Sequence, residues 1–532
     1  MRFCKALYRV IDCILKAPPE LGPTFLNKVD LADAYMRIWV RLEDIPSVAF
    51  LVPKATPEEE QLVGFHLSIP MGYVESAAFF CATTETVKDR ALDTLSTRHT
   101  APPHHMENLA ETKPPETMEE EAEATLSADK YWEALSPHAR ATALAHGEVY
   151  LDDFIGITQG GANERRQMTR HIFRAIDELF RPNDKDDISR KEPISLKKLR
   201  KGDAAWSTKK VILGWAIDTA KQVLTLPEDR KSSLLALLDT VPTSASRCSR
   251  RRWHKLLGTL RSTVPAIAGA AEIFTRLQHV LKKANGRRIN LTPPVKEELT
   301  VWRHLVASLA TRPTHLREIR PHPPTWIGAI DASLTGMGGV CNSLNGDWHV
   351  WRLTFSTAIR ANILTDKNPA GFLTINDLEL VAYISHLHLF APRMAPLEHI
   401  STGVDNTSAE IWDRRGSVST ATAIGPLLRE AAWITCQAKI HASIKRIPGV
   451  ENIEADAASQ LTHLPVHAFL KPFNTSFPQK TPWRLSLLPP GVTPRLQTML
   501  LTKKSPKASP LQDYAKTTQR GNSGTPSAHG HK

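Results

Sequence analysis

The sequence lacks the long apolar runs that membrane spans and secretion signals require. No stretch approaches 18 uninterrupted apolar residues, and about that many are needed to cross a bilayer as a helix. Lys5, Arg9 and Asp12 interrupt the apolar positions of residues 1–18, so this segment predicts an amphipathic helix rather than a signal peptide. We therefore expect an intracellular protein, cytoplasmic or nuclear or both, with no membrane partner.

Cysteine is scarce and scattered. The six cysteines include no C-x-x-C pair, which argues against a zinc site and against a disulfide framework. The sequence also contains no D-[ST]-G triplet, the motif that aspartic proteases need. These absences exclude a zinc knuckle and an aspartic protease, and they fit a reducing compartment.

Acidic residues are the minority among the charged ones. Lys and Arg number 67 against 55 Asp and Glu, a formal net charge of +12. Such an excess favours a polyanionic partner, most often nucleic acid. Because many basic proteins bind no nucleic acid, the motifs have to decide.

Local patterns predict several elements. Residues 100–128 are rich in Pro and then in Glu, and we expect a mobile surface insertion with little core. Residues 209–227 predict two strands with a turn at 219–221. Residues 166–181 show helical spacing, which places four apolar residues on one face: Met168, Ile172, Ile176 and Leu179.

Two adjacent carboxylates, Asp152 and Asp153, lie between the apolar runs of "EVYLDDFIGITQ", residues 148–159. Alone, such a pair is usually a solvated hairpin turn, because Asp tolerates left-handed backbone conformations. Upstream, "NKVDLADAYMRIWV" delivers Asp30 at the end of an apolar strand. Three carboxylates on strand ends and turns offer the hard oxygen ligands that Mg²⁺ prefers. Nucleotidyl transfer uses such a set to hold two divalent cations.

Four segments resemble the motifs of reverse transcriptases, in the family's order. "VDLADAY" is similar to the first catalytic motif and "YLDD" to the second. "IPMGYVESAAFF" (69–80) lies between them, where the family has a Pro-x-Gly motif, and "LGW" (213–215) resembles the primer-grip turn. The resemblance implies a polymerase palm with a ferredoxin-like βαββαβ core.

The resemblance also implies roles for individual residues. Asp30, Asp152 and Asp153 would be the catalytic, metal-binding carboxylates. Tyr35 would exclude a ribose 2′-hydroxyl, although core packing is an alternative for this ring. The other implied nucleotide or template contacts are Met71, Gly72 and Lys198, with Lys197 as an alternative to Lys198. Met71 departs from the Gln or Phe of many members, and Gly72 would admit close backbone approach.

A second set of acids follows after residue 325. None of these acids alone indicates a catalytic site, and a Glu on a helix is most often a surface residue. Together they resemble the ordered D-E-D-D set of ribonuclease H, and "IPGVENIEADAASQ" is similar to the end of retrotransposon ribonuclease H domains. The implied catalytic, metal-binding residues are Asp331 on a strand, Glu379 on a helix, Asp405 at a strand end and Asp456 at a helix start. Ser333 and Asn406 would tune these ligands through hydrogen bonds.

The resemblance implies a multidomain α+β and α/β protein from a retrotransposon polyprotein, of gypsy-like LTR or DIRS-like type. Each active site would bind two Mg²⁺ or Mn²⁺ ions, and the partners would be an RNA template, an RNA–DNA hybrid, a primer and deoxynucleotides. The implied parts are partial fingers and palm (1–227), a helical thumb or connection (228–320), a ribonuclease H-like domain (321–465) and a disordered tail (466–532).

Two further questions stay open in the sequence. Only 29 residues precede Asp30, fewer than the family's fingers usually need. The alternative is therefore an N-terminally truncated relic that binds nucleic acid or keeps only ribonuclease H activity. The basic residues of 228–320 would contact phosphates or else form a solvated helix face: Arg247, Arg250, Arg251, Arg252 and Lys255.

Overall fold

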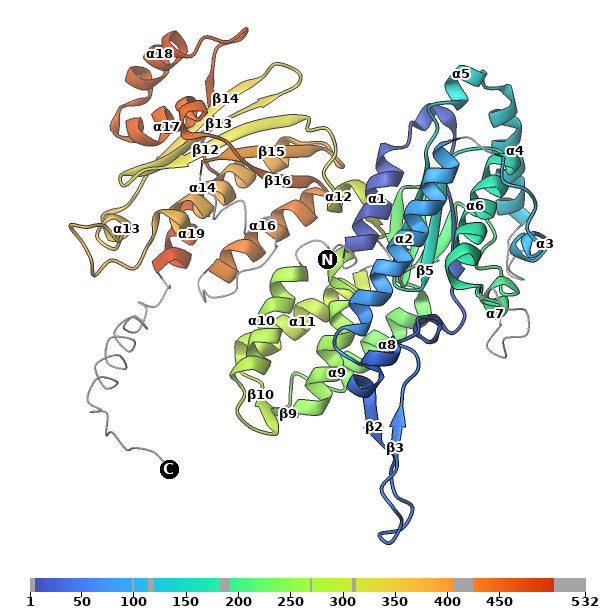
Figure 1. Ribbon diagram of the computed structural model, residues 1–532. Helices are drawn as coiled ribbons and strands as arrows, with labels where there is room; N and C mark the ends of the chain where they lie inside the picture. Colours follow the sequence, from blue (N-terminus) through green and yellow to red (C-terminus); the bar gives the residue numbers. More distant parts are fainter. Residues whose placement is uncertain are drawn as a thin grey trace, which may run out of the picture. The chain divides into compact units, whose positions relative to one another are not determined.

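The computed structural model describes residues 5–97, 100–112, 119–181, 192–267, 270–308, 312–405 and 424–501. The chain mixes helices and strands, as predicted, and divides into two compact units (Figure 1). Unit 1 comprises Met1–Ser246, Gly258–Ile267 and Leu299–Arg320, and unit 2 comprises Arg247–Leu257, Ala268–Glu298 and Pro321–Lys532. Within the described ranges, no helix has both the length and the apolar character to cross a membrane.

Unit 1 begins with helix α1 and strand β1, which ends at Asp30; a β-hairpin and a long helix follow, and strands β4 and β5 come later. Its principal elements are α1 (Ala6–Lys16), β1 (Phe25–Asp30), β2 (Ala49–Leu51), β3 (Val63–Phe65), α2 (Ser76–Ser96), α3 (Glu107–Ala110), α4 (Glu119–Ala134), α5 (Pro137–Arg140), β4 (Ala145–Tyr150), β5 (Asp153–Thr158), α6 (Ala162–Phe180), α7 (Leu196–Leu199), β6 (Lys209–Ile212), β7 (Trp215–Asp218), β8 (Val223–Thr225), α8 (Glu228–Asp239), β11 (Thr314–His315) and α12 (Leu316–Ile319).

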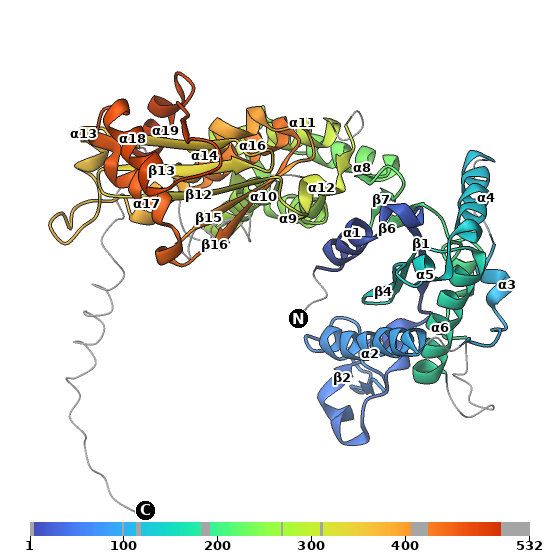
Figure 2. The same cartoon turned by 90° about the horizontal axis from the view of Figure 1, so that it is seen from above.

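An antiparallel sheet of order β1–β5–β4 forms the centre of unit 1. Helices α2 and α6 pack against each other and against this sheet, and α1 covers the opposite face (Figure 2). Alternation along β4 explains the two layers. Gly147 faces Met168 of α6, whereas the next residue, Glu148, pairs with Arg9 of α1 through Oε1 and Nη2 at 2.8 Å.

Two local predictions for unit 1 are corrected by the structure. Residues 209–227 form three strands rather than two, because Leu213 and Gly214 (φ +50° and +83°) make an additional tight turn between β6 and β7. On α6, Met168, Ile172 and Ile176 are buried as predicted, but Leu179 is 38% exposed. Phe180 takes its place in the core.

The segment predicted as a mobile insertion contributes to the core of unit 1 over residues 100–112. Ala101, Met106 and Ala110 are buried, and Glu107 makes two contacts of 2.7 and 2.8 Å with Arg170 of α6. The apolar residues are few, but Met106 and Ala110 join the core cluster that contains Met168, Ile172 and Phe173 of α6. Residues 113–118 lie outside the described chain, and mobility of the segment stays a prediction.

Unit 2 is built on one mixed sheet. Its principal elements are β9 (Arg247–Ser249), α10 (Ala270–Lys283), β10 (Arg288–Asn290), β12 (Trp326–Ala332), β13 (Gly336–Ser343), β14 (Trp348–Thr354), α13 (Thr357–Arg360), α14 (Ile375–Phe390), β15 (His399–Val404), α16 (Ile424–Ala438), β16 (His441–Arg446), α17 (Ile453–Gln460), α18 (Val466–Ser476), β17 (Arg484–Leu485) and α19 (Val492–Leu501). Two further helices, α9 (Arg250–Arg261) and α11 (Pro293–Ser308), contain residues of both units.

The sheet of unit 2 has the order β16–β15–β12–β13–β14–β17. Strands β12, β13 and β14 are antiparallel, whereas β15 runs parallel to β12 and β16 runs parallel to β15. Helices α14 and α17 both pack on β12 and β13. Alternation along β12 separates them, because Gly328 faces His386 of α14 while Ala329 joins the cluster that contains Ala458 of α17.

Residues 466–501 belong to the folded unit, which corrects the prediction of a disordered tail from residue 466. Strand β17 pairs in parallel with β14. Phe469, Phe473 and Trp483 are buried against Val340 and Val350 of the sheet. Helix α19 adds to the core on the α14 side. Prolines recur along this segment, but a few large apolar side chains decide the packing. Residues 502–532 lie outside the described chain.

Candidate functional site

Asp30 and Asp153 face each other across two strands of unit 1. Asp30 is the last residue of β1 and Asp153 the first of β5, and the antiparallel register pairs them directly. Residues paired in this way have Cβ atoms about 4.5–5.5 Å apart. Two positions separated by 123 residues therefore meet because of strand register.

Asp152 lies in the turn between β4 and β5. Leu151, just before it, has a φ of +55°, a left-handed conformation that is uncommon for residues with a side chain. The Asp152 carbonyl accepts a hydrogen bond from the Leu31 amide at 3.1 Å, which ties the turn to the residue after Asp30. The sequence motif thus forms the predicted hairpin.

Like charges and burial together perturb these carboxylates. Burial raises the pKa of Asp153 to about 7, and a hydrogen bond with Asp30 and the negative charges of Asp30 and Asp152 act in the same direction. Burial also raises the pKa of Asp152, with a further contribution from Asp30. A cation beside this set would relieve the repulsion.

Lys28 is a residue that the sequence analysis missed. It lies on β1 two residues before Asp30, with its ammonium nitrogen 3.6 Å from Asp153 Oδ1 and 3.4 Å from Asp203 Oδ2. Asp203 also pairs with Lys198 at 3.8 Å. Lys198, the lysine implied to contact the nucleotide, is therefore linked to Asp153 through Asp203 and Lys28. The period-2 spacing of Lys28 and Asp30 is the only sequence signal, because the pairing with Asp203 spans 175 positions.

The other predicted residues of unit 1 have distinct surroundings. The Tyr35 ring is half-buried and stacks on Phe80 of α2 with 4.4 Å between ring centroids. Gly72 has a φ of +102° with open space where a Cβ would be, and Met71 is 78% exposed. Tyr35 thus packs against the core, while Met71 and Gly72 lie at the surface.

Asp331 and Asp405 end neighbouring parallel strands of unit 2. Ala329 of β12 pairs with Gly403 of β15, so the two acids follow two residues later on adjacent strands. Burial raises the pKa of Asp331, and the charges of Asp405 and Asp456 raise it further, whereas a hydrogen bond from Ser459 lowers it. Asp405 and Asp456 therefore both lie close enough to Asp331 for their charges to act on it.

Helix α17 reaches Asp331 because glycine occupies the facing position of β13. Gly338 pairs with Asp331, and a Cβ on it would lie 2.6 Å from the Ala458 carbonyl carbon. This close approach brings Asp456 and Ser459 to the strand end. The Ser459 hydroxyl donates to Asp331 Oδ2, a hydrogen bond that no motif in the sequence indicates.

Glu379 is buried, and Ser333 bonds to backbone carbonyls. Glu379 is 5% exposed on α14, so it is not the surface residue that an isolated helical Glu usually is. The Ser333 hydroxyl bonds to the Gly336 and Ser459 carbonyls and stabilises the β12–β13 turn. Ser459 is the serine that contacts the Asp331 carboxylate. Asn406 lies outside the described residues.

One group of three possible metal ligands with atoms within 4.8 Å of one another occurs in the described ranges, and it is none of the predicted sets. It consists of His104, His105 and Asp177. His104 Nδ1 accepts from the Met106 amide at 3.2 Å, and Nε2 lies 3.0 Å from Asp177 Oδ2. These contacts make the group a hydrogen-bonded support for residues 100–112.

Comparisons with known proteins give weak likenesses. No protein-family model and no curated protein matches the sequence. Among solved structures, three complexes of foamy viral protease-reverse transcriptase are similar at 14% identity: a dRH form with double-stranded DNA, one with RNA/DNA hybrid and one with double-stranded DNA. Their TM-scores are 0.36, 0.36 and 0.35, over 82%, 82% and 80% of this chain. The chain spans 59%, 45% and 67% of those proteins' lengths.

Proposed function

We propose that this chain is an RNA-directed DNA polymerase with ribonuclease H activity from a retrotransposon. Its two reactions would be DNA synthesis on an RNA or DNA template and hydrolysis of the RNA strand of a hybrid. The observation that carries the proposal is the meeting of two separate carboxylate sets at strand ends, Asp30 with Asp152–Asp153 and Asp331 with Asp405 and Asp456.

The strand orders fit both implied folds. In unit 1, Ser207 bridges to Leu26 on the free edge of β1, so the order Ser207–β1–β5–β4 fits a βαββαβ palm whose last strand is reduced to one bridge. In unit 2, three antiparallel strands followed by two parallel ones, with α14 and α17 packed on the sheet, fit a ribonuclease H-like domain.

The donor chemistry fits divalent Mg²⁺ or Mn²⁺. All seven predicted ligands are carboxylates, the oxygen donors that these cations prefer. Burial raises the pKa of Asp153 and of Asp331, and neighbouring carboxylates raise it further through a repulsion that a cation would relieve. When bound, the ions supply charge neutralisation and an activated oxygen nucleophile. The chain's own contribution is to hold the carboxylates in place through strand register and, for Asp331, through the Ser459 hydroxyl.

Two substrates test the proposal separately. The purified chain with Mg²⁺ receives a primed RNA template with deoxynucleotides and, in a second reaction, a labelled RNA–DNA hybrid. We expect primer extension in the first and RNA cleavage in the second. Cleavage without extension would leave only the hydrolase part of the proposal, and binding without either activity would support the non-catalytic relic instead.

Lys28 should act as a positioning residue for Asp153. Replacing Lys28 by Met removes the cation between Asp153 and Asp203 while keeping a side chain of similar length. We expect primer extension to fall roughly tenfold, about 1.4 kcal/mol of transition-state free energy, with RNA cleavage unchanged. Lys28→Arg should restore most of the rate, and Lys209→Met is the exposed control. Equal losses in Lys28→Met and Lys209→Met would contradict the role.

Tyr35 should discriminate against ribonucleotides through its ring. Tyr35→Ala is expected to raise ribonucleotide incorporation relative to deoxynucleotides on the order of 100-fold, the scale of selectivity that a shaped pocket gives. Tyr35→Phe keeps the stacking on Phe80 and should keep the discrimination. Steady-state incorporation with both nucleotide types measures the ratio. An unchanged ratio in a folded Tyr35→Ala chain would assign the ring to core packing alone.

A further inference from the structure

A basic pocket lies at the start of α9, in unit 2. It has a volume of about 730 Å³ and is lined by Ser249, Arg250, Arg251, His254, Asn285, Gly286 and Arg287. The lining comes from the end of β9, the first turn and a half of α9 and the loop before β10. Residues 284–290 are thus brought to residues 247–254 by the antiparallel β9–β10 pairing, in which Ser249 faces Arg288.

The pocket's arginines lie in a stretch of sequence that is poor in acids. Between Arg247 and Arg288 the sequence contains one acidic residue, Glu272. Among the described residues, no carboxylate lies within ion-pair distance of Arg250, Arg251 or Arg287, although arginines elsewhere in unit 2 are paired. A cluster of positive charge that the fold leaves uncompensated is the electrostatic signature of an anion-binding surface.

The pocket is held in shape by backbone contacts. The Arg250 amide donates to the Arg287 carbonyl and the Arg250 Nη1 to the Ala284 carbonyl, both at 2.9 Å. Beneath it, the buried Trp253 indole donates to the Leu277 carbonyl at 3.2 Å. Arg250 therefore fixes the loop while presenting its remaining donors, so less ordering is needed when a ligand binds.

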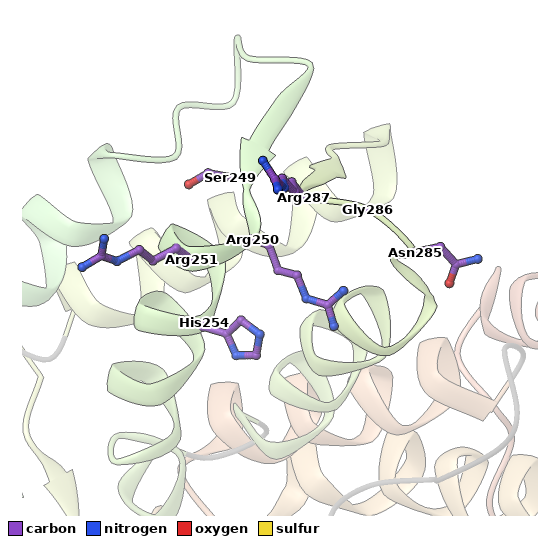
Figure 3. Close-up of a pocket in the computed structure, with 7 residues that line it drawn as sticks. All are labelled: Ser249, Arg250, Arg251, His254, Asn285, Gly286 and Arg287. Carbon is purple, nitrogen blue, oxygen red and sulfur yellow. The ribbon is translucent and has the colours of Figure 1, made fainter. Parts of the chain in front are cut away.

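The charges are spread over the pocket. Figure 3 shows the Arg250 and Arg251 side chains extending to opposite sides of the start of α9, with His254 below them. A single small anion would contact only part of this surface. A nucleic-acid strand presents a negative charge about every 3.4 Å of helix axis, which matches a distributed set of guanidinium groups.

The pocket belongs to unit 2, which also contains Asp331, Asp405 and Asp456. Buried Glu298 of α11 pairs with Arg276 of α10 at 2.5 Å and with Arg429 of α16 at 2.9 Å, and α16 packs on α14. Helix α10 leads directly into the pocket loop. The pocket is thereby joined, through the two ion pairs of buried Glu298 and through helices α16 and α14, to strand β12, which bears Asp331.

We propose that this pocket binds the phosphate backbone of the nucleic acid on which the unit 2 acids act, as a binding surface separate from both carboxylate sites. For the identity of its ligand the inference rests on the proposed function. The pocket would bind phosphates and show no sequence preference. It would anchor a hybrid whose RNA strand is being hydrolysed.

Equilibrium binding of the full chain to a fluorescent RNA–DNA hybrid, in EDTA over a range of salt concentrations, tests the pocket without either reaction. In the triple variant R250Q/R251Q/R287Q we expect the slope of log affinity against log salt to become shallower by about 2 to 3, because each phosphate that a side chain neutralises adds about 0.9 to the slope. The charge-matched control K221Q/K367Q/K480Q, which removes exposed lysines elsewhere, should change the slope by less than about 1, since none of these lysines lines the pocket.

Further variants and ligands separate the possible outcomes. R250K/R251K/R287K retains the charge and should retain most of the slope, and thermal unfolding verifies that each variant folds. If R250Q/R251Q/R287Q and K221Q/K367Q/K480Q changed the slope equally, the proposal that the pocket binds the phosphate backbone would be wrong. Unchanged hybrid binding together with loss of pyrophosphate binding would assign the pocket to free phosphates instead. Absence of hybrid binding by the wild-type chain would overturn the proposed function itself.

Discussion

Asp152→Asn should abolish primer extension and leave RNA cleavage intact. The substitution keeps the size of the side chain and removes the negative charge beside Asp30 and Asp153. Charge stabilisation of a phosphoryl-transfer transition state by a held cation amounts to several kcal/mol, so the rate should fall on the order of 1,000-fold, at about 1.36 kcal/mol for each tenfold step. Single-turnover extension of a labelled primer on an RNA template measures the loss.

A neighbouring residue of the same hairpin provides the matched control for Asp152. Glu148 is a buried acid, but its carboxylate pairs with Arg9 on the α1 face of the sheet. Glu148→Gln should reduce thermal stability while retaining extension in the folded fraction. Extension by Asp152→Asn at a rate close to wild type would show that the acidic pair is only a hairpin turn.

Asp331→Asn should have the reciprocal effect, abolishing RNA cleavage and sparing extension. Asp331 is half-buried, with the Ser459 hydroxyl on one carboxylate oxygen and the charges of Asp405 and Asp456 nearby. Loss of its charge should slow hydrolysis of the hybrid on the order of 1,000-fold, by the same transition-state arithmetic. Cleavage of an end-labelled RNA strand, followed by gel electrophoresis, gives the rate.

Ser459 allows a graded test of the same site. Ser459→Ala removes the hydroxyl from Asp331 but keeps the small side chain that α17 needs against β13, so a loss of roughly tenfold is expected, about 1.4 kcal/mol. Asp347→Asn, an exposed acid in the turn before β14 whose side chain contacts Arg484, is the control. If Asp331→Asn and Asp347→Asn cleaved the hybrid at the same rate, the unit 2 acids would not be the hydrolytic site.

The sequence by itself determined which acids are candidates and which kind of element carries each. Asp30 closes an apolar strand, Asp152 and Asp153 form the turn and first residue of the next hairpin strand, and Asp331 and Asp405 lie at strand ends. These features are local, because strand and helix periodicities and turn residues are set within a few positions of the chain. The helix at 166–181 was predictable for the same reason.

Only the tertiary structure decided what surrounds those acids. The register of β1 and β5 places Lys28 between Asp153 and Asp203, and the missing Cβ of Gly338 allows α17 to bring Ser459 to Asp331. The β9–β10 pairing likewise brings Arg287 into one pocket with Arg250 and Arg251, which lie 37 and 36 positions earlier in the chain. Contacts across such separations depend on which strands pair and how closely helices pack, and no local pattern of residues specifies either.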